Sequence, residues 1–122
     1  KFISCVSAED KLAHCISYMA AEIGFPIEAK TGVYSSDSTP FADSGIPALS
    51  FARIASSNVA PIHCRYDVKE VMSMEQLQWD IDFLVKFTER FANAAVCPVA
   101  REIPEKIKKE LDEYLARKRK EQ

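Results

Sequence analysis

A long amphipathic segment at residues 73–95 constrains the fold most strongly. Ser73 followed by Gln76 forms a capping box, which marks a helix start because the two side chains can bond backbone N–H groups that are free there. Apolar residues then recur at helical spacing, at Leu77, Ile81, Leu84, Phe87 and Phe91. Trp79 and Phe83 widen this stripe around the helix. We therefore expect both sides of the helix to be buried within the domain, or one side to contact another subunit.

A strand and a helix are expected at the beginning of the chain. Residues 2–6 form a short apolar run that is typical of a strand. Ser7 is the expected cap of the following helix, with Asp10 in the third position of a capping box and Gly24 then Pro26 as the stop. The apolar face of this helix is expected at Leu12, Ile16, Met19 and Ile23.

The middle of the chain reads as short strands around a short helix. Strands are expected at 26–30 and 47–51, with one or two helical turns between Pro40 and Gly45 and with Phe41 pointing inward. Residues 52–67 show no periodicity, and long irregular loops of this kind are often functional.

The last part of the chain predicts one more helix, which starts at Pro104. Its apolar face is expected at Ile107, Leu111, Tyr114 and Leu115. The basic run 117–120 is expected to be frayed and solvated. Helices that alternate with short strands indicate an α/β fold, with helices packed on a mainly parallel or mixed sheet. We divide the chain into a domain at 1–100 and an amphipathic helix at 101–122 that packs on it or extends from it.

Composition excludes several classes of function. With 122 residues and 48% hydrophobic composition, the chain can build one core. A net charge of −2 argues against nucleic-acid binding, which normally needs a basic face. No apolar run approaches the about 20 residues that span a bilayer, so we expect a soluble, cytoplasmic protein without membrane contact. Because the chain begins at Lys1, directly in an apolar segment, we expect a fragment of a longer protein.

The four cysteines form no C-x-x-C pair, so neither a zinc ribbon nor a thioredoxin-like site is indicated. We expect reduced thiols that are mostly buried as small hydrophobic side chains. Cys64 lies beside His63, but a Cys-His nucleophile needs the base to face the sulfur, which adjacency on an extended chain does not provide. His14 falls opposite the apolar face of its helix and is expected to be a surface residue rather than a metal ligand.

One ordered set of residues resembles a known family. The set comprises Ser36 and Asp37, Phe41, the run Gly-Ile-Pro-Ala at 45–48, His63 and Asp67. It resembles the C-terminal part of the co-catalytic zinc aminopeptidases, an exopeptidase family related to glutamate carboxypeptidases and glutaminyl cyclases. In that family a Ser-Asp-His-x-x-Phe segment leads through a Gly-Ile-Pro-Ala strand to a His-Thr-x-x-Asp-Thr segment and a long helix. The resemblance implies the C-terminal portion of a three-layer α/β/α domain.

The resemblance also implies roles for individual residues. His63 stands where the family places its last zinc ligand, and a neutral imidazole suits Zn²⁺. Asp67 would support it, since ligating histidines usually donate their second ring N–H to a carboxylate or carbonyl. Asp37 would lie near the metals without binding them. Tyr34 would correspond to a tyrosine that stabilises the tetrahedral intermediate.

Several family features are missing from the chain. Ser38 replaces the usual histidine after Asp37, and Cys64 and Val68 replace threonines of the last motif. The sequence contains no Glu-Glu pair, and the family's other ligands precede this region. The intact enzyme would use two zinc ions to hydrolyse N-terminal peptide bonds of a peptide substrate. The chain alone is therefore expected to be inactive and to need the N-terminal part of the same domain.

Two other functions remain open. The chain could be a catalytically dead interaction module that acts through Trp79, Phe83 and the charged terminal helix, with homo-oligomerisation as one possibility. It could also be a plain α/β domain without metal, in which His63 is a hydrogen-bonded loop histidine.

Overall fold

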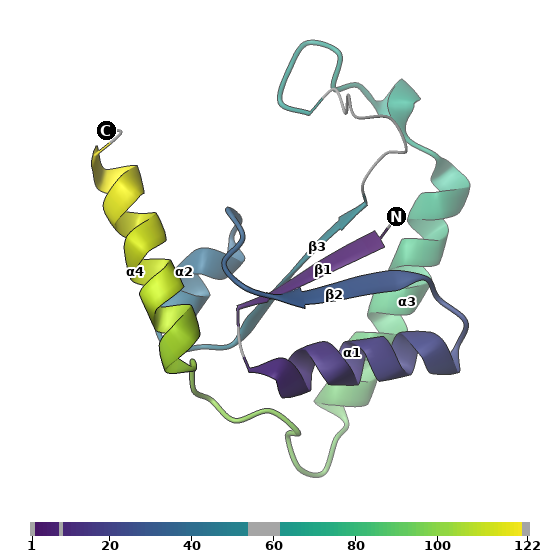
Figure 1. Cartoon of the computed structure of the whole chain (residues 1–122). Coiled ribbons are helices and arrows are strands. Elements are labelled where there is room, and N and C mark those ends of the chain that lie inside the picture. Colours follow the sequence, from purple (N-terminus) through teal and green to yellow (C-terminus); the bar gives the residue numbers. More distant parts are fainter. Residues whose placement is uncertain (1, 8, 54–61, 121–122) are drawn as a thin grey trace.

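The computed structural model describes residues 2–7, 9–53 and 62–120. Helices and strands alternate along the chain, as expected for an α/β protein (Figure 1). The elements are β1 (Phe2–Ser7), α1 (Asp10–Glu22), β2 (Ile27–Thr31), α2 (Ser38–Asp43), β3 (Ala48–Arg53), a 3₁₀ turn at Lys69–Val71, α3 (Met74–Ala92) and α4 (Glu105–Lys120).

The three strands form one mixed sheet in the order β2-β1-β3. β1 runs parallel to β2, with Phe2 opposite Ile27, and antiparallel to β3, with Phe2 opposite Arg53. The mixed alternative of the expected sheet is thus confirmed. A consequence of this polarity is that β2 and β3 end at opposite ends of the sheet.

Helices pack on the two faces of the sheet. Phe51 of β3 packs against the cluster formed with α1 and α3, and its ring lies 6.3 Å from that of Phe87. The next residue back along the strand, Ser50, donates a hydrogen bond to Ser38 of α2. Because successive side chains of a strand point to opposite faces, α2 lies on the face away from α1 and α3. α4 packs in turn on α2, through Ala42 and Ile107.

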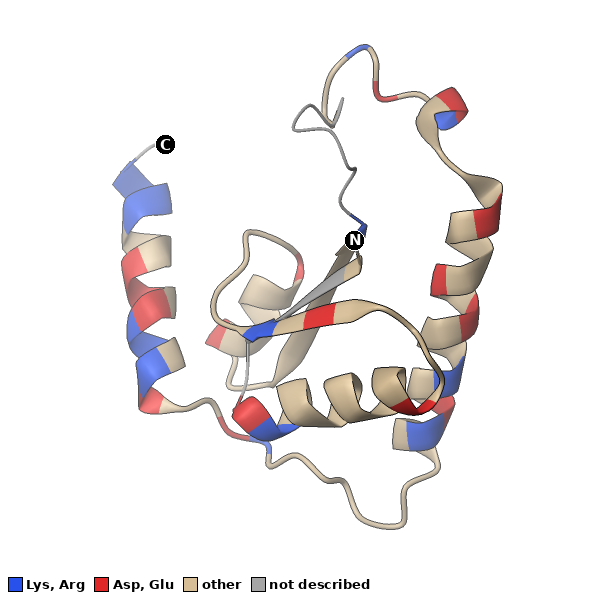
Figure 2. Ribbon diagram, turned by 45° about the vertical axis from the view of Figure 1, so that its right-hand side comes forward, with Lys and Arg blue, Asp and Glu red and all other residues tan. Residues whose placement is uncertain are grey.

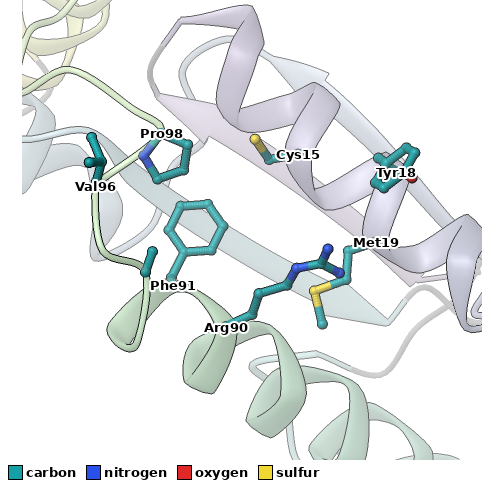
Figure 3. Close-up of a pocket in the computed structure, with 8 residues that line it drawn as sticks. Cys15, Tyr18, Met19, Arg90, Phe91, Val96 and Pro98 are labelled. Atoms are coloured by element: carbon teal, nitrogen blue, oxygen red, sulfur yellow. The ribbon is translucent and has the colours of Figure 1, made fainter.

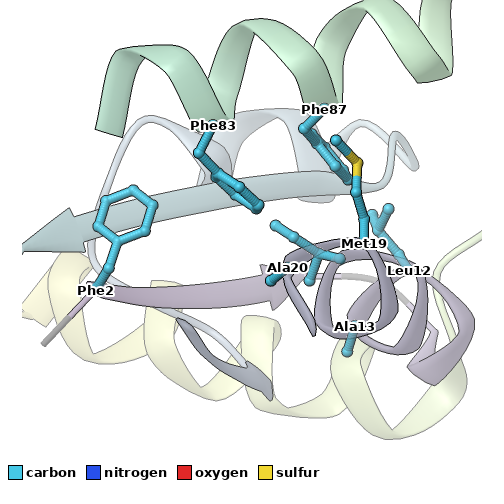
Figure 4. Close-up of a cluster of buried hydrophobic side chains, with 8 residues drawn as sticks. Phe2, Leu12, Ala13, Met19, Ala20, Phe83 and Phe87 are labelled. Atoms are coloured by element: carbon cyan, nitrogen blue, oxygen red, sulfur yellow. The ribbon is translucent and has the colours of Figure 1, made fainter. Parts of the chain in front are cut away.

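The larger core lies between the sheet, α1 and α3 (Figure 4). Its buried side chains are Phe2, Leu12, Ala13, Ile16, Met19, Ala20, Phe83 and Phe87. Phe83 is 1% exposed, and its ring stacks on that of Phe25 at a centroid distance of 4.2 Å. A smaller cluster joins α2 to α4 and contains Ala42, Ile103, Ile107 and Leu111. The predicted faces of α1 and α4 are largely confirmed, with Ile23 as the exposed exception.

α1 ends as expected but begins differently. Gly24 has φ +71°, and the N–H groups of Gly24 and Phe25 donate to the carbonyls of Ala21 and Ala20, which is a Schellman cap. The predicted cap at Ser7 is wrong, because Ser7 belongs to β1 and pairs with Ala48. Asp10 accepts a hydrogen bond from Thr31 Oγ1 at 2.8 Å, so its carboxylate links α1 to the end of β2.

α3 confirms the predicted cap and corrects the predicted face. Ser73 Oγ accepts a hydrogen bond from the Gln76 N–H at 3.3 Å, and the helix ends at Ala92 rather than near residue 95. The buried positions are Asp80, Phe83 and Phe87, whereas Trp79 is 57% exposed. Burial of both sides within the described residues is therefore wrong, because the contacts of Asp80 and Phe83 turn Trp79 and Ile81 towards solvent.

Two further expectations fail. Phe41 does not point inward but is 54% exposed, because α2 uses Ser38, Thr39 and Ala42 to pack on the sheet and on α4. The basic run at 117–120 is exposed, as expected, but it is helical rather than frayed, since α4 continues through Lys120, where basic side chains complement the helix dipole. No helix in the described part of the chain is long and apolar enough to cross a membrane.

Candidate functional site

His63 lies on an exposed turn that the Asp67 side chain closes. The His63 backbone N–H donates to Asp67 Oδ2 at 2.9 Å, and the Asp67 N–H donates to the Cys64 carbonyl at 2.9 Å. His63 has φ +57°, a left-handed conformation that is uncommon outside glycine. The Asp67 carboxylate therefore bonds to the backbone of His63, and the turn places the imidazole on the surface.

Tyr34 and Asp37 lie together on the segment between β2 and α2. Tyr34 is 47% exposed, and its carbonyl accepts a hydrogen bond from Thr39 Oγ1 at 2.9 Å. Asp37 occupies the position before the first residue of α2, where its side chain makes no capping hydrogen bond. The hydroxyl of Tyr114 on α4 donates to Ser35 Oγ at 2.7 Å, so α4 helps to hold this segment.

The structure keeps these two segments apart. The Tyr34 segment follows Thr31, which lies beside Val6, whereas β3 ends at Arg53, beside Phe2 at the other end of the sheet. In both Figure 1 and Figure 2 the turn with His63 stands well above the segment between β2 and α2. Of the four predicted site residues, only His63 and Asp67 contact each other.

The described residues do not by themselves fit a complete zinc site. Within residues 2–7, 9–53 and 62–120, no group of three or more His, Cys, Asp or Glu side chains could hold a metal ion. Protein zinc sites use three or four protein ligands. His63 could provide one such ligand, and the rest would have to come from elsewhere.

Three serine hydroxyls form a cluster that the sequence analysis missed. Ser36 Oγ and Ser50 Oγ both lie 2.8 Å from Ser38 Oγ, and Ser36 and Ser50 also bond to each other. Ser38 is buried. Each hydroxyl can both donate and accept, so the cluster satisfies itself and ties α2 to β3. The only signal in the sequence was Ser50 between the apolar residues Leu49 and Phe51.

A second missed feature is the ion pair between Arg53 and Asp80. Arg53 Nε donates to Asp80 Oδ2 at 2.6 Å, and Nη2 bonds to Oδ1, which makes the pair bidentate. The hydrogen bond to Asp80 raises the pKa of Arg53 above its usual range. The guanidinium also lies 5.3 Å from the centre of the Phe2 ring. The pair joins the end of β3 to the buried face of α3, so we assign it a structural role.

A cavity of about 260 Å³ lies between α1 and the C-terminal end of α3 (Figure 3). Cys15, Tyr18 and Met19 face Arg90 and Phe91 across it, and Val96 and Pro98 close one end. Arg90 bonds to Glu22, and this hydrogen bond raises the pKa of Arg90. The cation in this cavity therefore already has an anionic partner.

The second histidine and three cysteines differ in how far they are exposed. His14 is exposed on α1, as expected. Cys15 is partly buried, whereas Cys64 and Cys97 are exposed, so the expectation of mostly buried cysteines is wrong for the last two. Cys64 lies in the turn with His63, and Cys97 lies in the loop after α3, where its thiol donates to the Val99 carbonyl at 3.3 Å.

Charge is spread over the helices rather than gathered on one face. Figure 2 shows acidic residues alone on the first part of α3, both signs on its last part and along α4, and basic residues concentrated in the last turn of α4. This distribution agrees with the net charge of −2.

The comparison with protein-family models finds no match, and the searches of curated proteins and of solved structures find none either.

Proposed function

We propose that this chain supplies one zinc ligand, His63, to the two-metal site of an aminopeptidase that cleaves N-terminal residues from peptides. The observation that carries this proposal is the His63 turn. It follows a Gly-Ile-Pro-Ala segment that leads into β3, and the carboxylate of Asp67, four residues later, holds its backbone while the imidazole is exposed. The other ligands would come from residues outside this sequence, within a three-layer α/β/α domain.

An exposed apolar surface of the chain supports a missing partner. Many large apolar side chains between residues 62 and 85 contribute to it, namely Ile62, Tyr66, Val68, Val71, Met72, Met74, Trp79, Ile81 and Val85. We propose that the N-terminal part of the same domain covers this surface, which begins at the His63 turn.

The residues of the chain would then have different tasks. His63 would hold a metal through one ring nitrogen, and Asp67 would fix the turn through its bond to the His63 N–H. The metal pair would supply a nucleophilic hydroxide at neutral pH. Tyr34 and Asp37 could act in the same site only if the His63 turn approaches their segment in the assembled protein.

The natural polypeptide that contains this sequence provides the test. We expect two zinc ions per chain by elemental analysis and release of 4-nitroaniline from aminoacyl-4-nitroanilides. His63→Ala should lower the zinc content to about one ion and reduce kcat/KM at least as much as the about 10- to 100-fold expected for loss of a residue that supports a ligand. His14→Ala is the matched control, because His14 is an exposed histidine on α1 and should leave both values unchanged.

The outcome that contradicts the proposal is equally clear. If His63→Ala folds, as judged by circular dichroism, and keeps both its zinc content and its activity, then His63 is not a ligand. A natural protein that binds no zinc and cleaves no aminoacyl substrate would refute the aminopeptidase proposal as a whole.

The exposed apolar side of α3 supports a second candidate, an interaction module without catalysis. Trp79 is the residue that favours it, because an exposed tryptophan is a typical anchor of protein interfaces. Phe83 cannot share this role, since it is buried in the core. Trp79→Ala should abolish the association of the chain with its protein partner in sedimentation experiments while leaving the fold intact. Zinc bound at His63 would argue against this candidate.

A further inference from the structure

A second cavity lies on the other side of Phe91, between α1, β3, α3 and the segment 97–101. Its volume is about 360 Å³, at the lower end of the range of about 300–1,000 Å³ that is typical of small-molecule sites. We refer to it as the Arg101 cavity. The residues that define it are Leu12, Leu49, Phe87, Phe91, Val99 and Arg101.

We propose that the Arg101 cavity binds a small monocarboxylate with an apolar chain. The walls come from the main core, since Leu12 and Phe87 are core residues and Leu49 and Val99 pack against that core (Figure 4). An apolar chain is the group that such walls accommodate, because burying it removes apolar surface from water on both sides. The proposal is independent of the zinc site.

Charge determines which end group the ligand carries. No ion pair or hydrogen bond joins the Arg101 side chain to any other side chain in the described part of the protein. The arginine of the neighbouring cavity differs, because Arg90 is already bonded to Glu22 (Figure 3). A guanidinium matches the two oxygens of a carboxylate. One unpaired cation beside apolar walls suits one negative charge, whereas a phosphate would need more donors than this lining offers.

Chain length provides the first test, with the 122-residue chain and calorimetric titrations of butanoate, hexanoate, octanoate and decanoate. Each buried methylene should tighten binding about fourfold. Each step of the series adds two methylenes, so the affinity should rise about 15-fold per step until the cavity is full. Methyl signals of Leu12, Leu49 and Val99 in NMR spectra should shift on binding. Absence of binding, or affinity that does not depend on chain length, would overturn the proposal.

Matched arginine variants provide the second test. Arg101→Ala should weaken octanoate binding about two- to fivefold, as expected for a solvent-accessible ion pair, and should remove its salt dependence. Arg90→Ala should change neither. Octanol, which lacks the charge, should bind wild type and Arg101→Ala equally. Equal effects of the two arginine variants would show that the carboxylate does not bind at Arg101.

Filling the cavity tests the apolar part. Ala100→Phe places a ring in the lining from an exposed position and should abolish octanoate binding while circular dichroism stays unchanged. Thr88→Phe, on the exposed side of α3, is a second variant for the case in which Ala100→Phe does not fold. Unchanged octanoate affinity in a folded filling variant would place the ligand elsewhere and refute the site.

Discussion

Replacing Phe83 by alanine tests whether the stacked rings between the sheet and α3 hold the protein together. Phe83 is 1% exposed, and its ring lies 4.2 Å from that of Phe25, 6.2 Å from that of Phe2 and 6.3 Å from that of Phe87. A phenylalanine-to-alanine change in a closed core costs about 3–5 kcal/mol, because the transfer free energy is lost and a cavity remains. The surrounding rings cannot collapse freely, since β1 and α3 anchor Phe2 and Phe87, and the N–H of Phe25 bonds to the Ala20 carbonyl at the end of α1. We therefore expect about 4 kcal/mol for Phe83→Ala.

The size of this loss can be compared with the total stability. At about 0.05–0.15 kcal/mol per residue, a chain of 122 residues has a free energy of unfolding of about 6–18 kcal/mol. Phe83→Ala should therefore remove between a fifth and two thirds of it and lower Tm by about 15 °C. Trp79→Ala is the control on the same helix, because Trp79 is 57% exposed and its removal should cost less than about 1 kcal/mol.

Urea unfolding followed by far-ultraviolet circular dichroism measures both variants without relying on Trp79, the one tryptophan of the chain. The midpoint should fall strongly for Phe83→Ala with an unchanged m-value, and slightly for Trp79→Ala. If Phe83→Ala loses less than about 1 kcal/mol, or if Trp79→Ala loses as much, the assignment of the buried face of α3 is wrong.

Two further predictions concern polar groups. Asp80→Asn should lower the free energy of unfolding by about 1–3 kcal/mol, because it leaves the Arg53 guanidinium without its carboxylate. Since the pKa of Arg53 is raised in the folded protein, its stabilising effect is complete below the unfolded pKa and is lost only at higher pH. The loss of free energy of unfolding caused by Asp80→Asn should therefore be equal at pH 7 and pH 10 in urea titrations. A loss that disappears by pH 10 would contradict the stabilising role of the Arg53–Asp80 pair. Ser38→Ala should lower the free energy of unfolding by about 1–2 kcal/mol. The double variant with Ser50→Ala should lose less than the sum of the two single variants, because both changes disrupt the same hydroxyl cluster. Additive losses in thermal unfolding would show that the hydroxyls act separately.

The sequence predicted the elements because their patterns are local. The cap at Ser73 and the glycine after α1 depend on residues within one helical turn, and both form as expected. Ser7 looked like a cap by the same local rule. The rule failed there because β1 extends through Ser7, and its pairing with Ala48, forty-one residues later, is not visible in the local pattern.

The candidate site was less predictable because it depends on contacts between distant residues. The sequence placed an acidic residue four positions after His63, but not that its carboxylate bonds to the backbone N–H of His63 rather than to the ring. The Arg53–Asp80 pair joins residues twenty-seven positions apart, and neither residue stands out in its own segment. Apolar periodicity likewise could not tell Trp79 from Phe83, because the side of α3 that faces the sheet depends on distant contacts, those of Asp80 with Arg53 and of Phe83 with Phe25.

Strand polarity sets the strictest condition on the proposed metal site. β3 carries the chain away from the Tyr34 segment over six residues, or about 20 Å. The ten residues from Arg53 to His63 can span at most about 33–36 Å, so the chain is long enough for His63 to return to that end of the sheet. If one site uses both segments, spin labels at Ser35 and Arg65, in a variant whose native cysteines are replaced by alanine, should move closer when zinc is added to the natural polypeptide. An unchanged distance with zinc bound would show that Tyr34 takes no part in the site and would leave His63 and Asp67 as its only contributors from the four predicted residues.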